Sequence, residues 1–193
     1  MIFTIVTPPA ITPVTLSEAK SYLGITHTED DTMIKILISA STAWCEQYCY
    51  RKMITQTWKV FYQNWPVEIK LPFGNLQSVT HIKYTDTDGT QSTFSNTLYG
   101  VDTNSIPGRV VLNYQQTWPD DELAPLNPIE VQFVTGYGAA TTDVPEDIRN
   151  AIMLMVGHWY ENREPVVVGT IVSNIPLSVS SLLYNHRIWE WCL

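Results

Sequence analysis

Two cysteines are the first candidates for chemistry in this 193-residue chain. Cys45 and Cys49 lie four residues apart in a segment with helical periodicity, so their thiols share one face of a helix. A zinc site would need two more soft ligands. Of the four histidines, His27 is the nearest in sequence and the others are scattered. The pattern therefore favours packed thiols over a metal site, since unpaired cysteines are usually buried.

Two further groupings carry side chains that could act in catalysis or metal binding. Asp86-Thr87-Asp88-Gly89 offers carboxylates for calcium, but it lacks the glutamate that completes an EF-hand loop, and a strand pattern precedes it. Asp88-Gly89 instead predicts a hairpin turn. His158 and Glu161 lie three residues apart without a nucleophile or a third ligand. The sequence also lacks a phosphate-binding loop, a dinucleotide fingerprint and a Gly-x-Ser-x-Gly elbow, so we expect no catalytic residue, cofactor or metal ion.

The composition limits the classes of protein to which the chain can belong. Apolar residues make up 45% of it, which is enough for a core and argues against disorder. A net charge of −8 disfavours attraction to nucleic acids and anionic membranes. No segment reads as a signal peptide or a membrane span, and three sparse cysteines fit a reducing cytosol. Seven Trp and ten Tyr exceed what a small core needs, and aromatic residues are favoured in interfaces.

Helical patterns lie at the two ends of the chain. The segment TLSEAKSYLG predicts a short helix with a Thr15–Glu18 capping box and a stop at Gly24. A longer helix is expected from about Thr28 to residue 52, because apolar residues recur at helical spacing. Helical periodicity returns at Asp143 and ends at residue 164, and a last short helix is expected over 178–187.

The region between these helices has a different pattern. Short runs rich in Val, Ile, Thr, Tyr and Trp alternate with turn signals, which predicts five to seven strands in a small antiparallel sheet or sandwich. The expected strands lie at 55–63, 67–72, 79–85, 109–114 and 129–138. Because neither pair of flanking helices can bury its apolar face alone, we expect them to pack together.

The predicted architecture is therefore α+β: a small bundle of about four helices, with an antiparallel β domain inserted between the second and third helices. Residues 1–53 would form the N-terminal part of the bundle, residues 54–138 the inserted β domain, and residues 139–193 the C-terminal part of the bundle with a docking tail.

The C-terminal tail is unusual because it is apolar and aromatic, whereas chain ends are usually polar and frayed. Ile188, Trp189, Trp191 and Leu193 surround a single charge at Glu190. Such a tail either packs back on its own core or docks into a partner. The segment VVVGTIV (166–172) leaves the same two alternatives, an internal hairpin or a loop that is ordered only in an assembly.

Several segments in this order resemble one known family. They are TLSEAKSYL, the helix end AWCEQYCYRKMITQTW, QSVTHIKYTDTDG, FVTGYG, VPEDIRNAIMLMVGHWYENRE and IPLSVSSLLYNHR. From Thr15 to Arg187 the chain resembles the head–tail connector (adaptor, head-completion) proteins of long-tailed bacteriophages, in a long form with a β insertion.

The resemblance implies a structural role without catalytic residues or cofactors. Such proteins form a ring, here expected to hold twelve copies, beneath the portal of the virion. The ring extends the DNA channel, through which DNA passes without sequence-specific binding, and offers a platform for the next neck, stopper or tail protein. The family would assemble in the host cytoplasm and uses no membrane. Acidic clusters such as 120–122 would repel DNA if they faced the channel.

The resemblance also implies that the C-terminal segment docks onto the portal protein. In this sequence the docking residues would be Leu182, Leu183, Tyr184, Arg187, Ile188, Trp189, Trp191 and Leu193. Two other interpretations remain open at this point. One is a stopper or tail-completion component of the virion, and the other is a small ligand-binding or hydrolytic domain.

Overall fold

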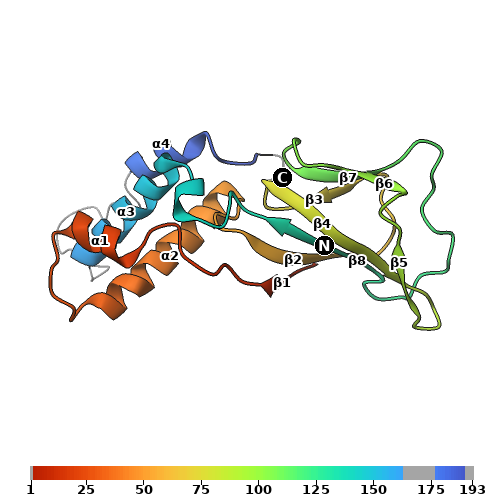
Figure 1. The fold of residues 1–193 in the computed structure, drawn as a ribbon, viewed down its shortest axis with the longest axis horizontal. Coiled ribbons are helices and arrows are strands. Elements are labelled where there is room, and N and C mark those ends of the chain that lie inside the picture. The colour runs from red at the N-terminus through yellow and green to blue at the C-terminus, as the bar shows by residue number, and fades with distance from the viewer. Residues whose placement is uncertain (1, 163–176, 190–193) are drawn as a thin grey trace, which may run out of the picture.

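The fold is described by a computed structural model that covers residues 2–162 and 177–189. The molecule is elongated, with the helices at one end and the strands at the other (Figure 1). No helix among these residues is long and apolar enough to cross a membrane. The expected α+β architecture is confirmed, because seven strands lie between the second and third helices.

In the part of the chain that the structure describes, the helical end contains four α-helices: α1 (Leu16–Leu23), α2 (Asp31–Cys49), α3 (Glu146–Glu161) and α4 (Leu177–Tyr184). The α1 capping box is present, with Thr15 and Glu18 satisfying each other's backbone N–H groups. Gly24 ends that helix in the left-handed conformation, at φ +70°. Pro145 precedes α3, and acidic residues occupy the first turn, where the helix dipole favours negative charge.

Within residues 2–162 and 177–189, eight strands form two antiparallel sheets. The larger has the order β1-β2-β8-β4-β5 and the smaller the order β3-β7-β6. Their bounds are β1 (Ile2–Thr7), β2 (Gln56–Tyr62), β3 (Ile69–Leu71), β4 (Leu76–Thr85), β5 (Gln91–Phe94), β6 (Tyr99–Asp102), β7 (Gly108–Leu112) and β8 (Ile129–Thr135). A short 3-10 helix, η1 (Thr141–Asp143), leads from the last strand toward α3.

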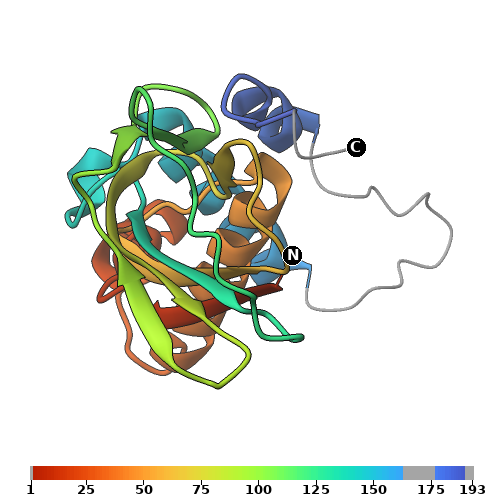
Figure 2. The same ribbon diagram turned by 90° about the vertical axis from the view of Figure 1, so that its right-hand side faces the viewer.

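Strand β1 corrects one detail of the expected organisation, which assigned residues 1–53 to the helical part. Residues 2–7 instead pair with β2, from Ile2 opposite Phe61 to Thr7 opposite Thr57. Figure 2 shows β1 in red at the margin of the strands. All six of its side chains are exposed, so the segment has no buried and exposed alternation from which a strand could be inferred.

The described residues form two hydrophobic core clusters that have no residue in common. One joins the helices and includes Ile34, Ile38, Ile148, Ile152 and Met155. The other fills the space between the two sheets and includes residues from both of them, such as Val60, Ile82, Val110, Val131 and Phe133. The two ends of the molecule therefore have separate interiors, and the segments between them must fix their relative position.

Candidate docking surface

Helix α4 holds the C-terminal segment against the helical end of the molecule. Val179 and Leu183 are fully buried in the helical cluster, and Leu182 packs against it while partly exposed. The backbone that follows is also fixed, because the Ile188 N–H donates to the Cys49 carbonyl at 3.0 Å. This segment thus folds back on its own chain.

Ile188 joins this segment to the strands as well. Only 3% of its surface is exposed, and its Cδ1 lies so close to Gly74 that a Cβ there would come within 2.6 Å. Gly74 lies between Phe73 and Asn75, and all three residues have a positive φ. This tight turn between β3 and β4 lies directly against the Ile188 side chain.

Arg51 is the polar centre of the same junction. Its side chain is nearly buried, and its Nε donates to the His186 carbonyl at 2.5 Å. Its Nη1 donates to Asn75 Oδ1, also at 2.5 Å. Hydrogen bonds from a charged donor are stronger than neutral ones, so one guanidinium links α2, the β3–β4 turn and the C-terminal segment. Burial raises the pKa of the neighbouring Tyr137, an effect that the charge of Arg51 opposes.

The outer side of the C-terminal segment carries aromatic rings that are linked through one guanidinium. We call this group the aromatic ladder: Trp44, Tyr48, Arg187, Trp189 and Tyr184. The Arg187 guanidinium lies 4.5 Å from the Trp189 ring centre and 5.1 Å from that of Tyr48. Tyr184 meets Trp189 edge-on at 5.3 Å, and Tyr48 stacks on Trp44 at 5.1 Å. Tyr184 is 57% exposed and Trp189 51% exposed, so these two rings can contact a partner.

The structure thus divides the eight residues predicted to dock onto the portal. Leu183 and Ile188 belong to the interior, and Leu182 and Arg187 are partly buried. Tyr184 and Trp189 are exposed at the surface. Trp191 and Leu193 lie outside the described residues.

Sequence reasoning missed that Trp44 and Tyr48 extend the same surface. Their helical spacing marked them as part of the apolar face of α2, whereas both remain partly exposed beside Arg187. The spacing of four residues, which brings two rings together on one helix face, is the signal that could have revealed the stack.

The two cysteines are packed thiols, as predicted. Cys45 and Cys49 are fully buried. Burial raises the pKa of both thiols to about 12, and for Cys45 the nearby Cys49 adds to the effect. Both therefore stay protonated at neutral pH, whereas nucleophilic attack needs the thiolate. Among the described residues, no three His, Cys, Asp or Glu side chains are grouped to hold a metal.

The Asp86–Gly89 segment is a hairpin turn, again as predicted. Asp86 Oδ1 accepts hydrogen bonds from the N–H groups of Asp88 and Thr90, at 3.0 and 2.8 Å. Gly89 supplies the left-handed conformation of the turn, at φ +83°. The carboxylate of Asp86 thus stabilises the loop between β4 and β5.

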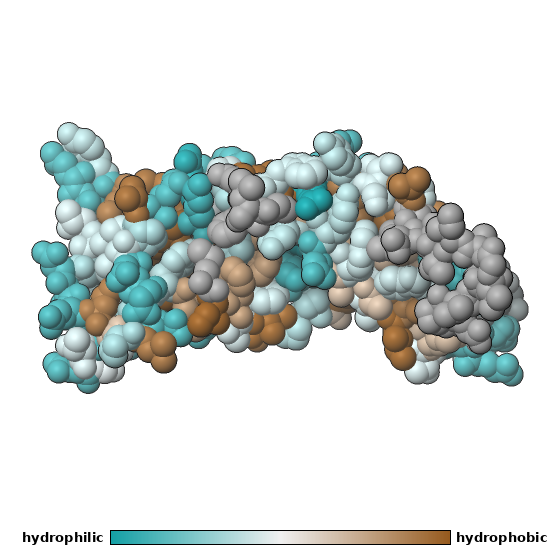
Figure 3. All heavy atoms as spheres, turned by 180° about the vertical axis from the view of Figure 1, so that it is seen from behind, coloured by the Kyte–Doolittle hydropathy of each residue, from teal (hydrophilic) through white to brown (hydrophobic). Residues whose placement is uncertain are grey.

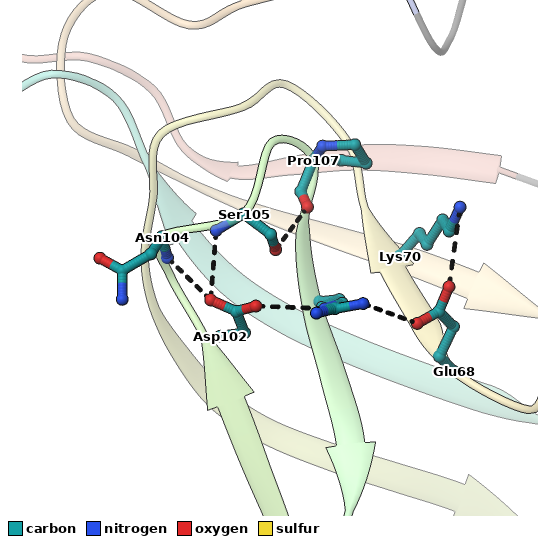
Figure 4. A network of polar contacts seen from close by, with 7 residues as sticks. Glu68, Lys70, Asp102, Asn104, Ser105 and Pro107 are labelled. Atoms are coloured by element: carbon teal, nitrogen blue, oxygen red, sulfur yellow. Dashed lines mark hydrogen bonds and ion pairs between the residues drawn. The ribbon is translucent and has the colours of Figure 1, made fainter.

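A second polar network lies on the smaller sheet (Figure 4). Arg109 Nε donates to Asp102 Oδ2 at 3.1 Å, and its Nη1 lies 3.5 Å from Glu68. Asp102 Oδ1 accepts from the N–H groups of Asn104 and Ser105, and these bonds, followed by Arg109, lower the pKa of the Asp102 carboxyl. Since each carboxylate is occupied by a donor or a cation, the network fixes the β6–β7 loop and offers no free acid or base.

Comparison with known proteins shows the family to which the chain belongs. The family of head completion proteins matches residues 12–188. The chain belongs to the head completion protein family. The resemblance found in the sequence is therefore confirmed over nearly the whole chain. No curated protein sequence matches closely enough to add a relative.

Solved structures share the fold of this head completion protein. A chain from the neck of an empty gene transfer agent (GTA) particle, computed with C6 symmetry, superposes with a TM-score of 0.80 at 19% identity. A chain from the neck of the native particle, computed with C12 symmetry, gives 0.79 at the same identity. A chain from the virion of the native particle gives 0.77, again at 19% identity. Each match covers 97% of this chain and 95% of the other.

Proposed function

We propose that this head completion protein is a structural head–tail connector without catalytic activity or cofactor. Copies of the chain form a ring, of twelve subunits in our proposal, below the portal of a tailed virion assembled in the host cytoplasm. The ring extends the DNA channel and joins the head to the next neck or tail protein. The observation that carries the proposal is the family match over residues 12–188. The shared fold with chains from particle necks, one computed with C12 symmetry, supports it.

The charge of the protein suits a channel through which DNA passes. Acidic residues number 19 and basic ones 11, so the subunit carries a net charge of −8. A ring of such subunits repels the phosphate backbone and lets DNA move without adhering. No sequence-specific contact with DNA is needed for this role.

We further propose that the exposed rings of the C-terminal segment dock onto the portal protein. Tyr184 and Trp189 protrude from a segment that Ile188 and Leu183 hold in place from below. Large aromatic residues on a preorganised support are typical of binding hot spots. Arg187 belongs to the same surface and Leu182 lies at its base, while Trp191 and Leu193 continue the segment beyond the described residues.

The test of the connector proposal is the mass of the assembly. Light scattering of the protein alone, and then with the portal protein of the same virus, should reveal a ring in one of the two samples. A protein that stays monomeric and does not bind the portal protein would refute the connector role. A protein that binds particles only after other neck proteins have been added would instead favour the role of a stopper or tail-completion component.

The docking proposal needs a variant that keeps the internal anchor. A chain ending at Ile188 retains the hydrogen bond to Cys49 and the contact with Gly74 but lacks Trp189 and the residues beyond it. We expect at least tenfold weaker portal binding, because removing a tryptophan from a binding hot spot costs about 2 kcal/mol or more of binding free energy. Tyr114→Ala, an exposed ring on the strand end, is the matched control. Unchanged binding by the truncated chain would overturn the docking role.

A further inference from the structure

Strand β1 is an exposed apolar edge of the larger sheet. It pairs with β2 on one side, and among the described residues no strand pairs with it on the other. Ile2, Phe3, Ile5 and Val6 are all exposed. Edge strands are normally protected by charged side chains, yet the chain has no charged residue before Glu18. A register shift between Ile5 and Thr7 interrupts the otherwise regular ladder with β2.

Hollows run beside this edge along helix α2. One lies between Phe3, Phe73 and the end of α2 at Tyr50, and also borders Ala43 and Glu46. Two more continue along the helix beneath the segment from Pro8 to Pro13. In Figure 3 hydrophobic side chains reach the surface along the lower margin of the molecule, the margin on which β1 lies in Figure 1. The free edge and the hollows form one continuous surface, which we call the β1 face.

The β1 face is separate from the aromatic ladder. Ser39, Ala43 and Glu46 line its hollows, whereas Trp44 and Tyr48 carry the ladder. At 100° per residue these two sets lie on different flanks of α2. A substitution on the β1 face can therefore leave the portal-docking rings in place, which allows the two surfaces to be tested independently.

We propose that the β1 face is a lateral interface of the ring, occupied by a neighbouring copy of this chain whose backbone adds to the free edge of β1. The proposal rests on the connector function proposed above. A subunit of a closed ring must offer two different lateral surfaces to its neighbours. Addition of a strand to a free edge supplies main-chain hydrogen bonds, while the apolar side chains on both sides of β1 and the hollows along α2 supply specificity.

Ring symmetry also determines what the neighbour contributes. Pairing of β1 with β1 of a second copy would place the two chains about a twofold axis and would end in a dimer. A cyclic ring requires a head-to-tail contact, so the neighbour presents a different part of its surface to β1. Each subunit then has its apolar edge covered, and only the assembled ring is free of an aggregation-prone strand.

The decisive experiment places a lysine at the edge. Ile5 is 42% exposed and lies opposite Trp58 of β2, so Ile5→Lys should keep the fold while placing a charge at the interface. We expect at least tenfold weaker association between copies, measured by sedimentation velocity under the conditions in which the wild type forms its ring. Val67→Lys, at a 95% exposed site beyond β2, makes the same chemical change and should leave the ring intact. Circular dichroism would verify that both variants are folded, and Val6→Lys would replace Ile5→Lys if that variant does not fold.

The outcomes distinguish this inference from the connector proposal. If the wild type forms no ring with or without the portal, the connector proposal fails. If the wild type and Ile5→Lys form rings equally well, only the assignment of the β1 face is overturned. A photo-crosslinking residue at position 5 should link to another copy of this chain, whereas one at position 67 should not. Crosslinking to the portal or to a tail protein instead would also overturn it.

Discussion

The two ends of the molecule use their aromatic residues in opposite ways. Among the described residues, no aromatic side chain is fully buried in the helical cluster, and Trp44, Tyr48, Trp159 and Tyr160 lie at its margin. In the strand cluster Phe94, Tyr99 and Phe133 are buried, and Trp65 stacks on Trp118 at 4.6 Å. The strand end therefore uses several of its rings to fill the space between two sheets, whereas the rings of the helical end lie at the margin of its core.

This comparison predicts the largest loss of stability for an aromatic residue in the strand cluster. Phe133 is fully buried on β8, a central strand of the larger sheet. Phe133→Ala should lower the free energy of unfolding by about 3–5 kcal/mol, through lost burial and the cavity left behind. Trp159→Ala, which removes a partly exposed ring from the helical margin, should cost about 1–2 kcal/mol, since less surface leaves water. Urea denaturation of both variants measures the difference.

An equal loss for the two variants would refute the comparison. It would show that Trp159 contributes as much to the helical interior as Phe133 does to the strand interior. The exposed control Tyr114→Ala should change the free energy of unfolding by less than about 0.5 kcal/mol.

A second prediction concerns the junction that joins the two ends. Arg51→Met keeps most of the side-chain length but removes both donors, so the His186 carbonyl and Asn75 Oδ1 lose their partner. We expect a loss of about 2–3 kcal/mol, because buried hydrogen bonds to a charged group are among the stronger ones. Thermal unfolding followed by circular dichroism measures it, with Lys35→Met on the exposed side of α2 as the control. A loss as small as that of the control would show that the two ends stay together without Arg51.

The helical end of the molecule can be predicted from the sequence more completely than the strand end, because helices depend on local interactions and strands on distant ones. Helix caps such as Thr15 with Glu18 act over three residues, so the starts and ends of the helices can be inferred locally. Strand β1 pairs with a partner fifty or more residues away and buries no side chain, so no local pattern marks it. Strands β5 and β6 are only four residues long, and their positions follow from hairpin register rather than from hydrophobic alternation.

The candidate docking surface was predictable only in part. An apolar tail can be seen in the sequence, but periodicity cannot tell which of its residues point inward. Ile188 is buried because the left-handed turn at Gly74 makes room for it, and that turn lies more than one hundred residues earlier. The separation of anchor residues from exposed rings is therefore a property of the tertiary fold.

Two glycines provide a matched pair for the turn at the junction. Gly24 and Gly74 both have a positive φ, and a Cβ at Gly24 would meet nothing within 4 Å. Gly24→Ala should cost about 1 kcal/mol from the left-handed backbone alone. Gly74→Ala should cost more, about 1.5–2.5 kcal/mol, because its Cβ would also displace Ile188. If Ile188→Ala is already present, the extra loss should vanish in urea denaturation. An excess that persists would show that backbone atoms, rather than Ile188, resist the added carbon.

The smallest expected effect concerns a charge on the solvent side of the larger sheet. Glu130 lies 2.9 Å from Lys59 Nζ and 3.0 Å from His81 Nε2, both on neighbouring strands. Partial burial would raise the pKa of this carboxyl, but the hydrogen bonds from His81 and Lys59 outweigh it and hold the pKa below its usual value near 4.5. A carboxyl with a lowered pKa in the folded protein contributes stability above the pKa of the unfolded chain. That contribution is lost as the pH falls through the folded-state value.

Glu130→Gln should therefore lower the free energy of unfolding at pH 7 by about 0.5–1 kcal/mol, a range reduced for solvent screening of a partly exposed pair. The difference from the wild type should shrink as the pH falls below about 4.5 and vanish once the wild-type carboxyl is protonated. Urea denaturation at a series of pH values measures this, with Glu122→Gln at an exposed loop position as the control. A difference that stayed constant down to low pH would mean that Glu130 acts through packing rather than through its charge. The ion pairs across β2, β8 and β4 would then contribute nothing to holding the sheet whose free edge is β1.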